Sequence, residues 1–369
     1  MWRYQCRYFL SDRPCKIRKD KPQINCRRCK YFFPFKEKIL IIKLAAPGDV
    51  LRTTFLLNPL KHKFPHSQIY WLTSRPSDEI LQLNPLVDKI ILWPENALLY
   101  LLTENFDLVI NLDLSEPALL LGRLTRSKNI LGFFRDKNGR LGGSNPAAEY
   151  WLQMSLDDGL KKANQKTYQE IMSEILNLPA AARARPLIQL PESSRRFARQ
   201  MFHKWKLAGN KIVGLNPGAG RRWPLKQWTT EGYLALIKGL LKKPEIKILL
   251  LGGEAEQELL NTLARKSKSS RVIHTGNNSL KDFFALIDRL NLLVTTDSLA
   301  LHAGLALGKK VVAIFGPTSS TEIEMYNLGQ KVVTPLKCRV CYRTSCDKHP
   351  NCMEAIEPKQ VIAAVEALL

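Results

Sequence analysis

Asp49 is an isolated acid in the loop between a predicted strand and a predicted helix. The run Ile39 to Ile42 is short, apolar and rich in β-branched residues, which is typical of a strand buried on both faces. Beyond the loop, apolar side chains recur at helical spacing at Val50, Leu51, Leu57 and Leu60. A carboxylate at the end of a central strand could take a proton from a hydroxyl group, although the same side chain could simply cap the helix.

Polar or glycine residues also follow four predicted strands in the second half of the chain. They are Asn216-Pro217-Gly218, Gly252-Gly253-Glu254, Thr296-Asp297-Ser298 and Gly316-Pro317-Thr318. The carboxyl ends of parallel strands face the ligand crevice, and glycine lets the backbone approach a phosphate. Arg221 and Arg222 could bind a diphosphate, and Glu254 could accept the hydroxyls of a ribose or complement a helix dipole. This half is therefore predicted to bind a nucleotide.

The eight cysteines fall into two groups of four. Four precede the first predicted strand, and four lie near the end of the chain: Cys6, Cys15, Cys26 and Cys29, then Cys338, Cys341, Cys346 and Cys352. Each group contains one C-x-x-C, the spacing of a thiolate metal site, and four thiolates suit structural zinc or an iron–sulfur cluster equally well. The other spacings are irregular, so free thiols and disulfides stay open as alternatives.

The elements that position these residues alternate between strand and helix in both halves. The first half predicts strands at 39–42, 68–72, 90–92, 108–112 and 129–133, with helices between them and over most of 147–178. The second half predicts strands at 211–215, 246–251, 271–274, 292–295 and 311–315. Such alternation favours parallel sheets, here two α/β halves with a cleft between them. The proline-bracketed stretch 179–186 is the predicted linker, and no G-x-G-x-x-G or P-loop motif is present.

Composition indicates a globular protein with an anionic partner. Hydrophobic residues make up 45% and charged residues 24% of the chain, and the formal net charge is +23. Residues 1–38 alone hold twelve Lys or Arg against three acids. Nucleic acid, a phospholipid surface or a phosphorylated small molecule would each match this charge. No apolar run reaches the ~20 residues of a membrane span, and the N-terminus lacks the apolar core of a signal peptide, so a cytoplasmic protein is expected.

Three motifs resemble glycosyltransferase family 9, the family of ADP-heptose:lipopolysaccharide heptosyltransferases. In chain order they read IIKLAAPGDVLRTTFLL, NPGAGRRWPLKQW and TTDSLALHAGLALGKKVVAIFGPTS. The tail KCRVCYRTSCDKHPNCM is similar to a cysteine-bearing segment found in a subset of that family. The N-terminal cysteine segment is an addition that typical members lack.

The resemblance implies a GT-B fold, in which two Rossmann-like domains with parallel sheets face a central cleft. Residues 38–178 would form the acceptor domain, and 187–355 the donor domain with its cysteine segment 338–352. The helix expected at 356–369 would cross back to the first domain. The basic extension, residues 1–37, would then pack near the C-terminal cysteines.

The implied activity is the inverting transfer of a heptose, or a related sugar, from an ADP-sugar to a lipopolysaccharide inner-core acceptor without a catalytic metal. Asp49 is the implied base, Arg221 a phosphate contact where lysine is usual, and Glu254 a ribose contact. His302 would be either a direct ligand or a packed core residue, and Leu299 replaces the usual glycine of its motif. The predicted donor-binding residues are Asn216, Gly218, Arg221, Arg222, Glu254, Thr296, Asp297, Ser298, His302 and Gly316.

Gly48, Arg52, Arg75 and Arg135 are predicted to contact the acceptor. An acceptor of the lipid A and Kdo type is anionic, so the basic surface would hold the protein at the cytoplasmic face of the inner membrane. One alternative is a family member with a different nucleotide sugar or acceptor. A second is a nucleic-acid-binding protein in which the N-terminal cysteines form a zinc module, but that hypothesis leaves the donor loops without a role. No nucleic acid partner is expected on the first hypothesis.

Overall fold

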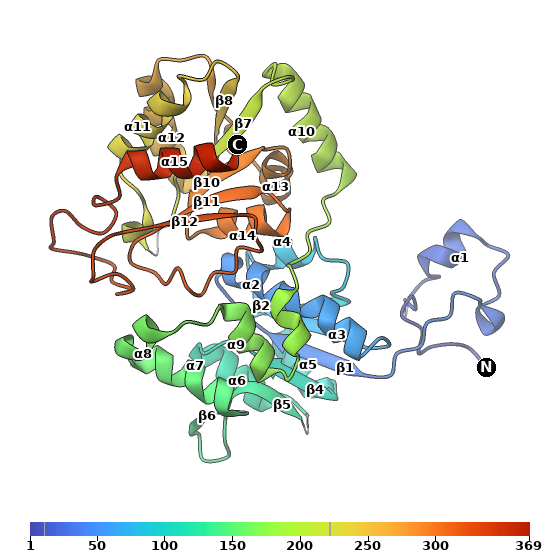
Figure 1. Ribbon diagram of the computed structural model, residues 1–369. Coiled ribbons are helices and arrows are strands. Elements are labelled where there is room, and N and C mark those ends of the chain that lie inside the picture. The colour runs from blue at the N-terminus through green and yellow to red at the C-terminus, as the bar shows by residue number, and fades with distance from the viewer. Residues whose placement is uncertain (11, 128, 221–222) are drawn as a thin grey trace.

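Two α/β domains and a small N-terminal module make up the structure, a computed structural model that describes residues 1–10, 12–127, 129–220 and 223–369 (Figure 1). The module, residues 1–37, projects from the side of the first domain and contains α1 (Lys16–Asp20) and the 3₁₀ turn η1 (Cys26–Arg28). The prediction of two α/β halves is confirmed, because each domain is built on its own six-stranded sheet.

The sheet of the first domain has the strand order β3-β2-β1-β4-β5-β6. Neighbouring strands pair in parallel except for β5 and β6, which are antiparallel. The strands are β1 (Lys38–Ile42), β2 (Gln68–Ser74), β3 (Lys89–Trp93), β4 (Leu108–Asn111), β5 (Ile130–Arg135) and β6 (Leu141–Gly143). Residues 39–42 of β1 are fully buried, as expected for a central strand covered on both faces.

Helices cover both faces of this first sheet. They are α2 (Pro47–Thr53), η2 (Thr54–Leu56), α3 (Leu57–Lys63), α4 (Asp78–Leu81), α5 (Ala97–Thr103), α6 (Glu116–Leu124), α7 (Pro146–Leu156), α8 (Asp158–Ala163) and α9 (Tyr168–Ile175). The predicted linker, 179–186, begins with the turn η3 (Pro179–Arg183), and the chain then has no regular secondary structure up to residue 191.

The sheet of the second domain has the order β12-β11-β10-β7-β8-β9, and all of its strand pairs are parallel. Its strands are β7 (Lys211–Asn216), β8 (Ile246–Leu250), β9 (Val272–His274), β10 (Leu292–Thr296), β11 (Lys310–Phe315) and β12 (Gly329–Val333). Its helices are α10 (Glu192–Lys204), α11 (Thr230–Leu240), α12 (Gln257–Ser267), α13 (Leu280–Asp288), α14 (Leu299–Ala306) and α15 (Pro358–Leu368), with the short turns η4 (Pro224–Lys226) and η5 (Glu254–Glu256).

Both sheets reverse their strand order beside their first strand, between β1 and β4 and between β7 and β10. In doubly wound sheets this reversal opens a crevice at the carboxyl ends of the strands, where ligands bind. Asp49 lies in the first turn of α2, just after β1, while Asn216 ends β7 and Asp297 directly follows β10. The topology therefore places all three residues at crevices.

Two expectations about the ends of the chain are wrong. Helix α15 packs against α11 and the second sheet, with Val361, Ala364 and Val365 buried in the second domain's core, so it does not cross back to the first domain. Ile362 lies against Gly239 of α11, where a Cβ would come within 2.6 Å of its side chain. The N-terminal module lies on the opposite side of the molecule from the C-terminal cysteine segment (Figure 1).

The two domains share apolar contacts as well as the cleft. Leu51 of α2 and Ile80 of α4 belong to a core cluster that otherwise consists mainly of second-domain residues, including Phe284 and Leu301. No helix among the described residues is long and apolar enough to span a bilayer.

Candidate functional site

A cleft of about 790 Å³ lies between the two domains. Its first-domain wall comes from the start of α2 and from α7 and α8, and its second-domain wall from the loops after β7, β8 and β10. The predicted residues that line it are Gly48, Asp49, Arg52, Asn216, Gly218, Asp297, Ser298 and His302. Residues from both halves of the sequence therefore meet at one place.

Asp49 is the third residue of α2, and Ala46 is the N-cap. The Asp49 carboxylate accepts a hydrogen bond from the Ala46 N–H at 3.4 Å and pairs with Nη2 of Arg52 at 2.8 Å. Burial would raise the pKa of this carboxyl group, but the positive charges of Arg52 and Lys43 outweigh burial and hold that pKa at about 2. The side chain is still 37% exposed, so Asp49 presents an ionised carboxylate to the cleft.

Arg52 is fixed by an aromatic ring as well as by Asp49. Its guanidinium lies 4.0 Å from the centre of the Tyr168 ring, and the Tyr168 hydroxyl lies 2.7 Å from Oγ1 of Thr53. Burial disfavours the charge, but the neighbouring Asp49 carboxylate outweighs it and raises the pKa of Arg52, so the guanidinium stays protonated. Its Nε is buried and has no hydrogen-bond partner among the described residues. Arg52 itself lines the cleft, so its charge lies close to a ligand bound there.

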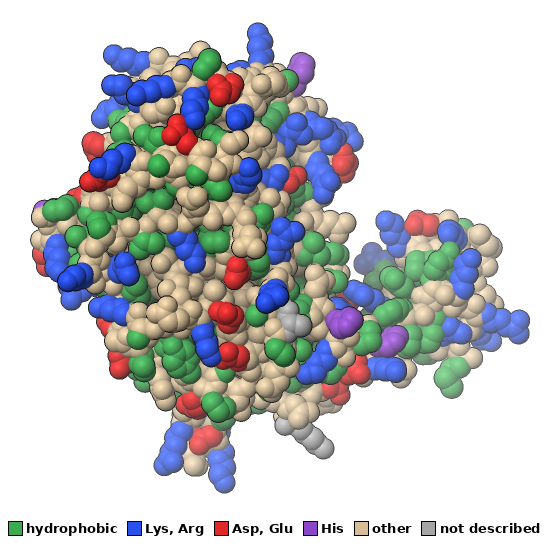
Figure 2. Space-filling model, viewed as in Figure 1, with side chains coloured by type: hydrophobic (Ala, Val, Ile, Leu, Met, Phe, Trp, Pro, Cys, Tyr) green, Lys and Arg blue, Asp and Glu red, His purple; other side chains and the backbone are tan. Residues whose placement is uncertain are grey.

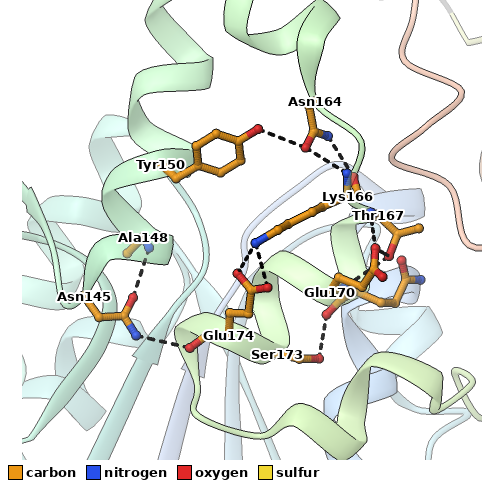
Figure 3. A network of polar contacts seen from close by, with 10 residues as sticks. Asn145, Ala148, Tyr150, Asn164, Lys166, Thr167, Glu170, Ser173 and Glu174 are labelled. Carbon is orange, nitrogen blue, oxygen red and sulfur yellow. Dashed lines mark hydrogen bonds and ion pairs between the residues drawn. The ribbon is translucent and has the colours of Figure 1, made fainter.

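A polar network holds the helices beside the first-domain wall of the cleft in place (Figure 3). The Tyr150 hydroxyl donates to Oδ1 of Asn164 at 3.1 Å, and Nδ2 of Asn164 donates to the Lys166 carbonyl at 2.7 Å. Nζ of Lys166 then pairs with both carboxylate oxygens of Glu174 at 2.8 Å. The network ties α7 to α9 and so positions the cleft residues of α7 and α8, which are Trp151, Met154, Ser155 and Lys161.

The second-domain wall is built around the ends of β7 and β10. Nδ2 of Asn216 donates to the Leu251 carbonyl at 2.9 Å, and its Oδ1 accepts from the hydroxyls of Thr295 and Ser298. Nζ of Lys226 pairs with Oδ2 of Asp297 at 2.8 Å. Burial would raise the pKa of the Asp297 carboxyl, but the Lys226 charge helps to lower it, so the pair stays ionic. Lys226 is a cleft residue that the sequence analysis did not single out.

A second acid takes the place predicted for Glu254. Glu254 is exposed and does not line the cleft, whereas Glu256, two residues later, does. Oε2 of Glu256 accepts from the Gly253 N–H at 2.9 Å. A Cβ at Gly218 would come within 2.6 Å of the Glu256 side chain, so a larger residue at position 218 would displace Glu256. The spacing from Gly253 to Glu256, an N-cap followed by an acid at N3, is the signal that could have identified Glu256.

Gly48 allows α2 of the first domain to approach α14 of the second. A Cβ at position 48 would lie 3.1 Å from Cδ2 of His302 and 3.6 Å from Cα of Leu299. His302 is 8% exposed and lines the cleft, so it is both packed and accessible to a ligand. Burial, helped by the Arg52 charge, lowers the pKa of its imidazole to about 4, so the ring is neutral at pH 7.

Glu322 and Tyr342 also line the cleft. Both lie in loops, outside the predicted strands. The Tyr342 hydroxyl donates to Oε1 of Glu322 at 3.2 Å and accepts from the Ser319 N–H at 3.2 Å. Burial raises the pKa of Glu322 above its usual range. Tyr342 belongs to the cysteine segment, so that segment forms part of the cleft wall. The Tyr168 N–H donates to the Glu322 carbonyl at 2.9 Å and joins the two domains beside it.

Several predicted residues lie away from the cleft. Thr296 is buried and donates to the Gly218 carbonyl, and Gly316 packs against Cys352 and Met353. Arg75 pairs with Asp78 and Glu95, and Arg135 donates to the Gly139 carbonyl; neither lines the cleft. Arg221 and Arg222 lie outside the described residues, so their predicted phosphate contacts stay predictions.

The cysteines stay in their two groups. Cys352 is buried, and burial together with the neighbouring Cys341, Cys346 and Cys338 raises the pKa of its thiol to about 11. Across the described part of the chain, no three His, Cys, Asp or Glu side chains are close enough together to hold one metal ion. The metal predicted on the cysteines therefore stays a prediction.

Comparison with known proteins places the sequence in a family. The family model described as glycosyltransferase family 9 (heptosyltransferase) matches residues 98–351. A lipooligosaccharide heptosyltransferase 2 from Campylobacter jejuni is 32% identical over 166 residues, which are 43% of this chain and 52% of that protein. The chain thus spans about half the length of this curated relative.

Solved structures share the fold. The glycosyl transferase family 9 protein from Veillonella parvula has a TM-score of 0.70 and 21% identity, with 90% of this chain and 97% of that chain covered. E. coli ADP-heptose lps heptosyltransferase II has a TM-score of 0.66 and 19% identity, with 90% and 98% covered.

Proposed function

The chain belongs to glycosyltransferase family 9, and on that premise we propose that it transfers a heptose, or a related sugar, from an ADP-sugar to a lipopolysaccharide inner-core acceptor. The transfer inverts the configuration at C1 of the sugar and needs no catalytic metal. The observation that carries this proposal is the cleft in which Asp49 and Arg52 of one domain face Lys226, Asp297 and the glycine loops of the other.

Asp49 is the base in this proposal. The acceptor hydroxyl oxygen attacks C1 from the side opposite the diphosphate, its proton passes to the Asp49 carboxylate, and the bond from C1 to the diphosphate oxygen breaks. The departing nucleoside diphosphate takes the electron pair of that bond. Because the pKa of Asp49 is about 2, the carboxylate is a weak base toward a free hydroxyl. Proton transfer therefore accompanies C–O bond formation, which makes the hydroxyl proton acidic.

The second domain binds the donor. Lys226 and the glycine loop that carries Gly218 and Gly220 stabilise the diphosphate as its charge grows. Glu256, and not the predicted Glu254, contacts the ribose. Leu280 and Phe283 form an apolar corner of the cleft, beside Asn278, that suits a nucleobase.

The first domain binds an anionic acceptor. Arg52 and Lys161 are the cations that this domain's described residues place in the cleft. Lys and Arg side chains are also spread over the visible face of both domains and over the N-terminal module (Figure 2). A positive surface of this kind favours peripheral contact with the anionic cytoplasmic leaflet, where a lipid-linked acceptor is accessible.

A donor screen by thermal shift tests the proposal. ADP-heptose and GDP-, UDP- and dTDP-sugars are compared at equal concentration, with AMP as the control that lacks the diphosphate. We expect ADP-heptose to raise Tm most. A ligand stabilises the folded state by RT ln(1 + [L]/Kd), so at equal concentration the donor with the lowest Kd gives the largest shift. A larger shift with another nucleotide sugar would move the assignment to that donor. No shift with any of them would contradict the transferase function.

A further inference from the structure

The N-terminal module has no packed core of its own. None of its described residues is buried, and aromatic or aliphatic side chains such as Trp2, Tyr8, Phe9 and Leu10 are 43% to 45% exposed. A segment of fewer than ~40 residues buries too little apolar surface to fold by itself and usually needs disulfides, a metal or a partner. The module projects from the first domain, so that domain does not supply its core (Figure 1).

All four N-terminal cysteines line one cavity inside this module. The cavity measures about 350 Å³, and its wall contains Cys6, Cys15, Cys26 and Cys29 among apolar side chains that include Ile17, Ile24 and Phe32. The thiols come from three separate stretches of the segment. Their convergence is therefore a property of the fold and does not follow from neighbouring positions in the sequence.

Backbone and side-chain contacts hold the first and last of these stretches together. The N–H of Arg7 donates to the Phe33 carbonyl at 2.8 Å, and the N–H of Phe35 donates to the Gln5 carbonyl at 3.0 Å, so Cys6 lies beside the chain that follows the C-x-x-C turn. The guanidinium of Arg3 donates to the Cys29 carbonyl at 3.1 Å and lies 4.3 Å from the centre of the Phe32 ring.

The C-x-x-C turn and Cys15 are also fixed locally. The turn η1 begins at Cys26, and the side chain of Asn25 accepts a hydrogen bond from the Arg27 N–H at 2.9 Å. Cys15 precedes α1, and its carbonyl accepts from the N–H groups of Arg18 and Lys19 at 3.0 Å. Each cysteine is thus placed by the backbone around it.

The side chains around the cavity carry net positive charge, which would stabilise a negatively charged metal–thiolate centre. Arg3, Arg13 and Arg18 line the cavity, against the single carboxylate of Asp12. Four thiolates around a divalent cation, or around an iron–sulfur cluster, carry net negative charge, which nearby guanidinium groups stabilise. In Figure 2 basic and hydrophobic side chains lie together over this module.

We propose that residues 1–37 bind a metal centre through the thiolates of Cys6, Cys15, Cys26 and Cys29, and that this centre serves as the core of the module. We assign an iron–sulfur cluster and not a single zinc ion, because no three metal-ligating side chains of the described residues lie close enough together to hold one ion. One zinc ion draws four thiolates to about 2.3 Å from a common point, whereas a cluster spreads its thiolates around a larger body. All four cysteines line the same cavity, and in the described chain no three of them are close enough together to hold one ion.

The proposed centre is structural and separate from the transfer chemistry. The module contacts the first domain through the Arg7–Asp88 ion pair at 2.8 Å and the rings of Phe33 and His66, whose centres are 4.9 Å apart. None of these residues lines the cleft between the domains. Loss of the centre should therefore leave nucleotide-sugar binding unchanged.

The test compares metal content in matched cysteine variants purified without oxygen. The background is Cys338→Ser/Cys341→Ser, in which the C-terminal cysteines cannot supply a full set of four thiolates. We expect this protein to hold one iron–sulfur cluster per chain, with iron and acid-labile sulfide in equal amounts and a visible absorption band. Adding Cys26→Ser/Cys29→Ser should remove both iron and sulfide. Hydrogen exchange of residues 1–37 should then become fast, while that of residues 211–216 stays slow.

Three outcomes would count against the proposal. Zinc without iron, lost in the same variant, would retain the four-thiolate site but overturn the cluster. Metal content that does not change with Cys26→Ser/Cys29→Ser would overturn the site. So would a protein without metal whose four N-terminal cysteines form disulfides. If the variant fails to fold, treating the background protein with an iron chelator gives the same hydrogen-exchange comparison.

Discussion

Asp49→Asn should lower kcat for sugar transfer by about 10³-fold while the affinity for the nucleotide sugar changes less than about threefold. Asparagine keeps the size of the side chain and can still receive the Arg52 guanidinium, but it cannot accept the proton of the acceptor hydroxyl. Donor binding relies on the second domain and is therefore retained. Steady-state kinetics and calorimetry of donor binding on the same preparation measure the two effects. Glu231→Gln, an exposed acid on α11, is the control for loss of a carboxylate.

The pH profile separates Asp49 from His302 as the base. The pKa of Asp49 is lowered to about 2, so its basic form is present at every pH above that value and is lost only in strong acid. The pKa of His302 is lowered to about 4, so its neutral form is equally constant near neutrality. Either base therefore gives a flat log(kcat/KM) from pH 5.5 to 8, and the two differ only in acid. With Asp49 as the base we expect the profile to stay flat through pH 4, whereas an inflection near pH 4 that disappears in His302→Asn would assign the base to His302.

Arg52→Gln should shift the acid limb of the log(kcat/KM) profile to higher pH. The Arg52 charge is the largest influence that lowers the pKa of Asp49, and burial acts in the opposite direction. Without Arg52, burial weighs more heavily, and the Asp49 carboxyl gains a proton at a higher pH than in the parent protein.

Full transfer activity in Asp49→Asn, or donor affinity lost together with turnover, would contradict the role of Asp49 as base.

Lys226→Met should raise KM for the nucleotide sugar about 10- to 100-fold, the effect of losing one hydrogen bond between charged groups. Methionine keeps the length of the side chain but removes the ammonium that would bind the diphosphate. Lys226→Arg should recover part of the affinity because it restores the charge with a different geometry. Initial rates at varied donor concentration give both parameters.

A double variant decides how Lys226 acts. Its Nζ lies 2.8 Å from the Asp297 carboxylate, so its loss leaves a largely buried negative charge without a partner. If Lys226 only neutralises Asp297, then Lys226→Met/Asp297→Asn should regain the donor affinity of the parent. Direct contact with the diphosphate predicts that the double variant stays at least as weak as Lys226→Met. Recovery would therefore remove Lys226 from the donor site.

Strand positions could be predicted from sequence because buried parallel strands are continuous apolar runs. The run 39–42 and the segments that became β7, β8, β10 and β11 all carry this signal, and the loops after them could be assigned to a crevice. Strand β12 was not predicted, because its sequence Gly329–Val333 mixes polar and apolar residues at the edge of the sheet.

The side chains that complete the cleft were harder to predict, because they depend on local turns and on packing between distant segments. Glu254 and Glu256 both follow β8, and only the turn η5 determines that Glu256 lies over Gly218. Lys226 ends the short turn η4 and Tyr342 lies in an irregular loop, and periodicity carries no information about either. The apolar pattern of α15 predicts a helix but not the domain that it covers.

The configuration at C1 of the transferred sugar shows directly how the transfer proceeds. In the proposed mechanism one carboxylate, Asp49, assists a single displacement of the diphosphate at C1. The anomeric configuration of donor and product can be compared by NMR after transfer by the parent protein. We predict that the product has the configuration opposite to that of the donor. Retention of configuration would contradict this account, because it requires either a second displacement or attack from the diphosphate side.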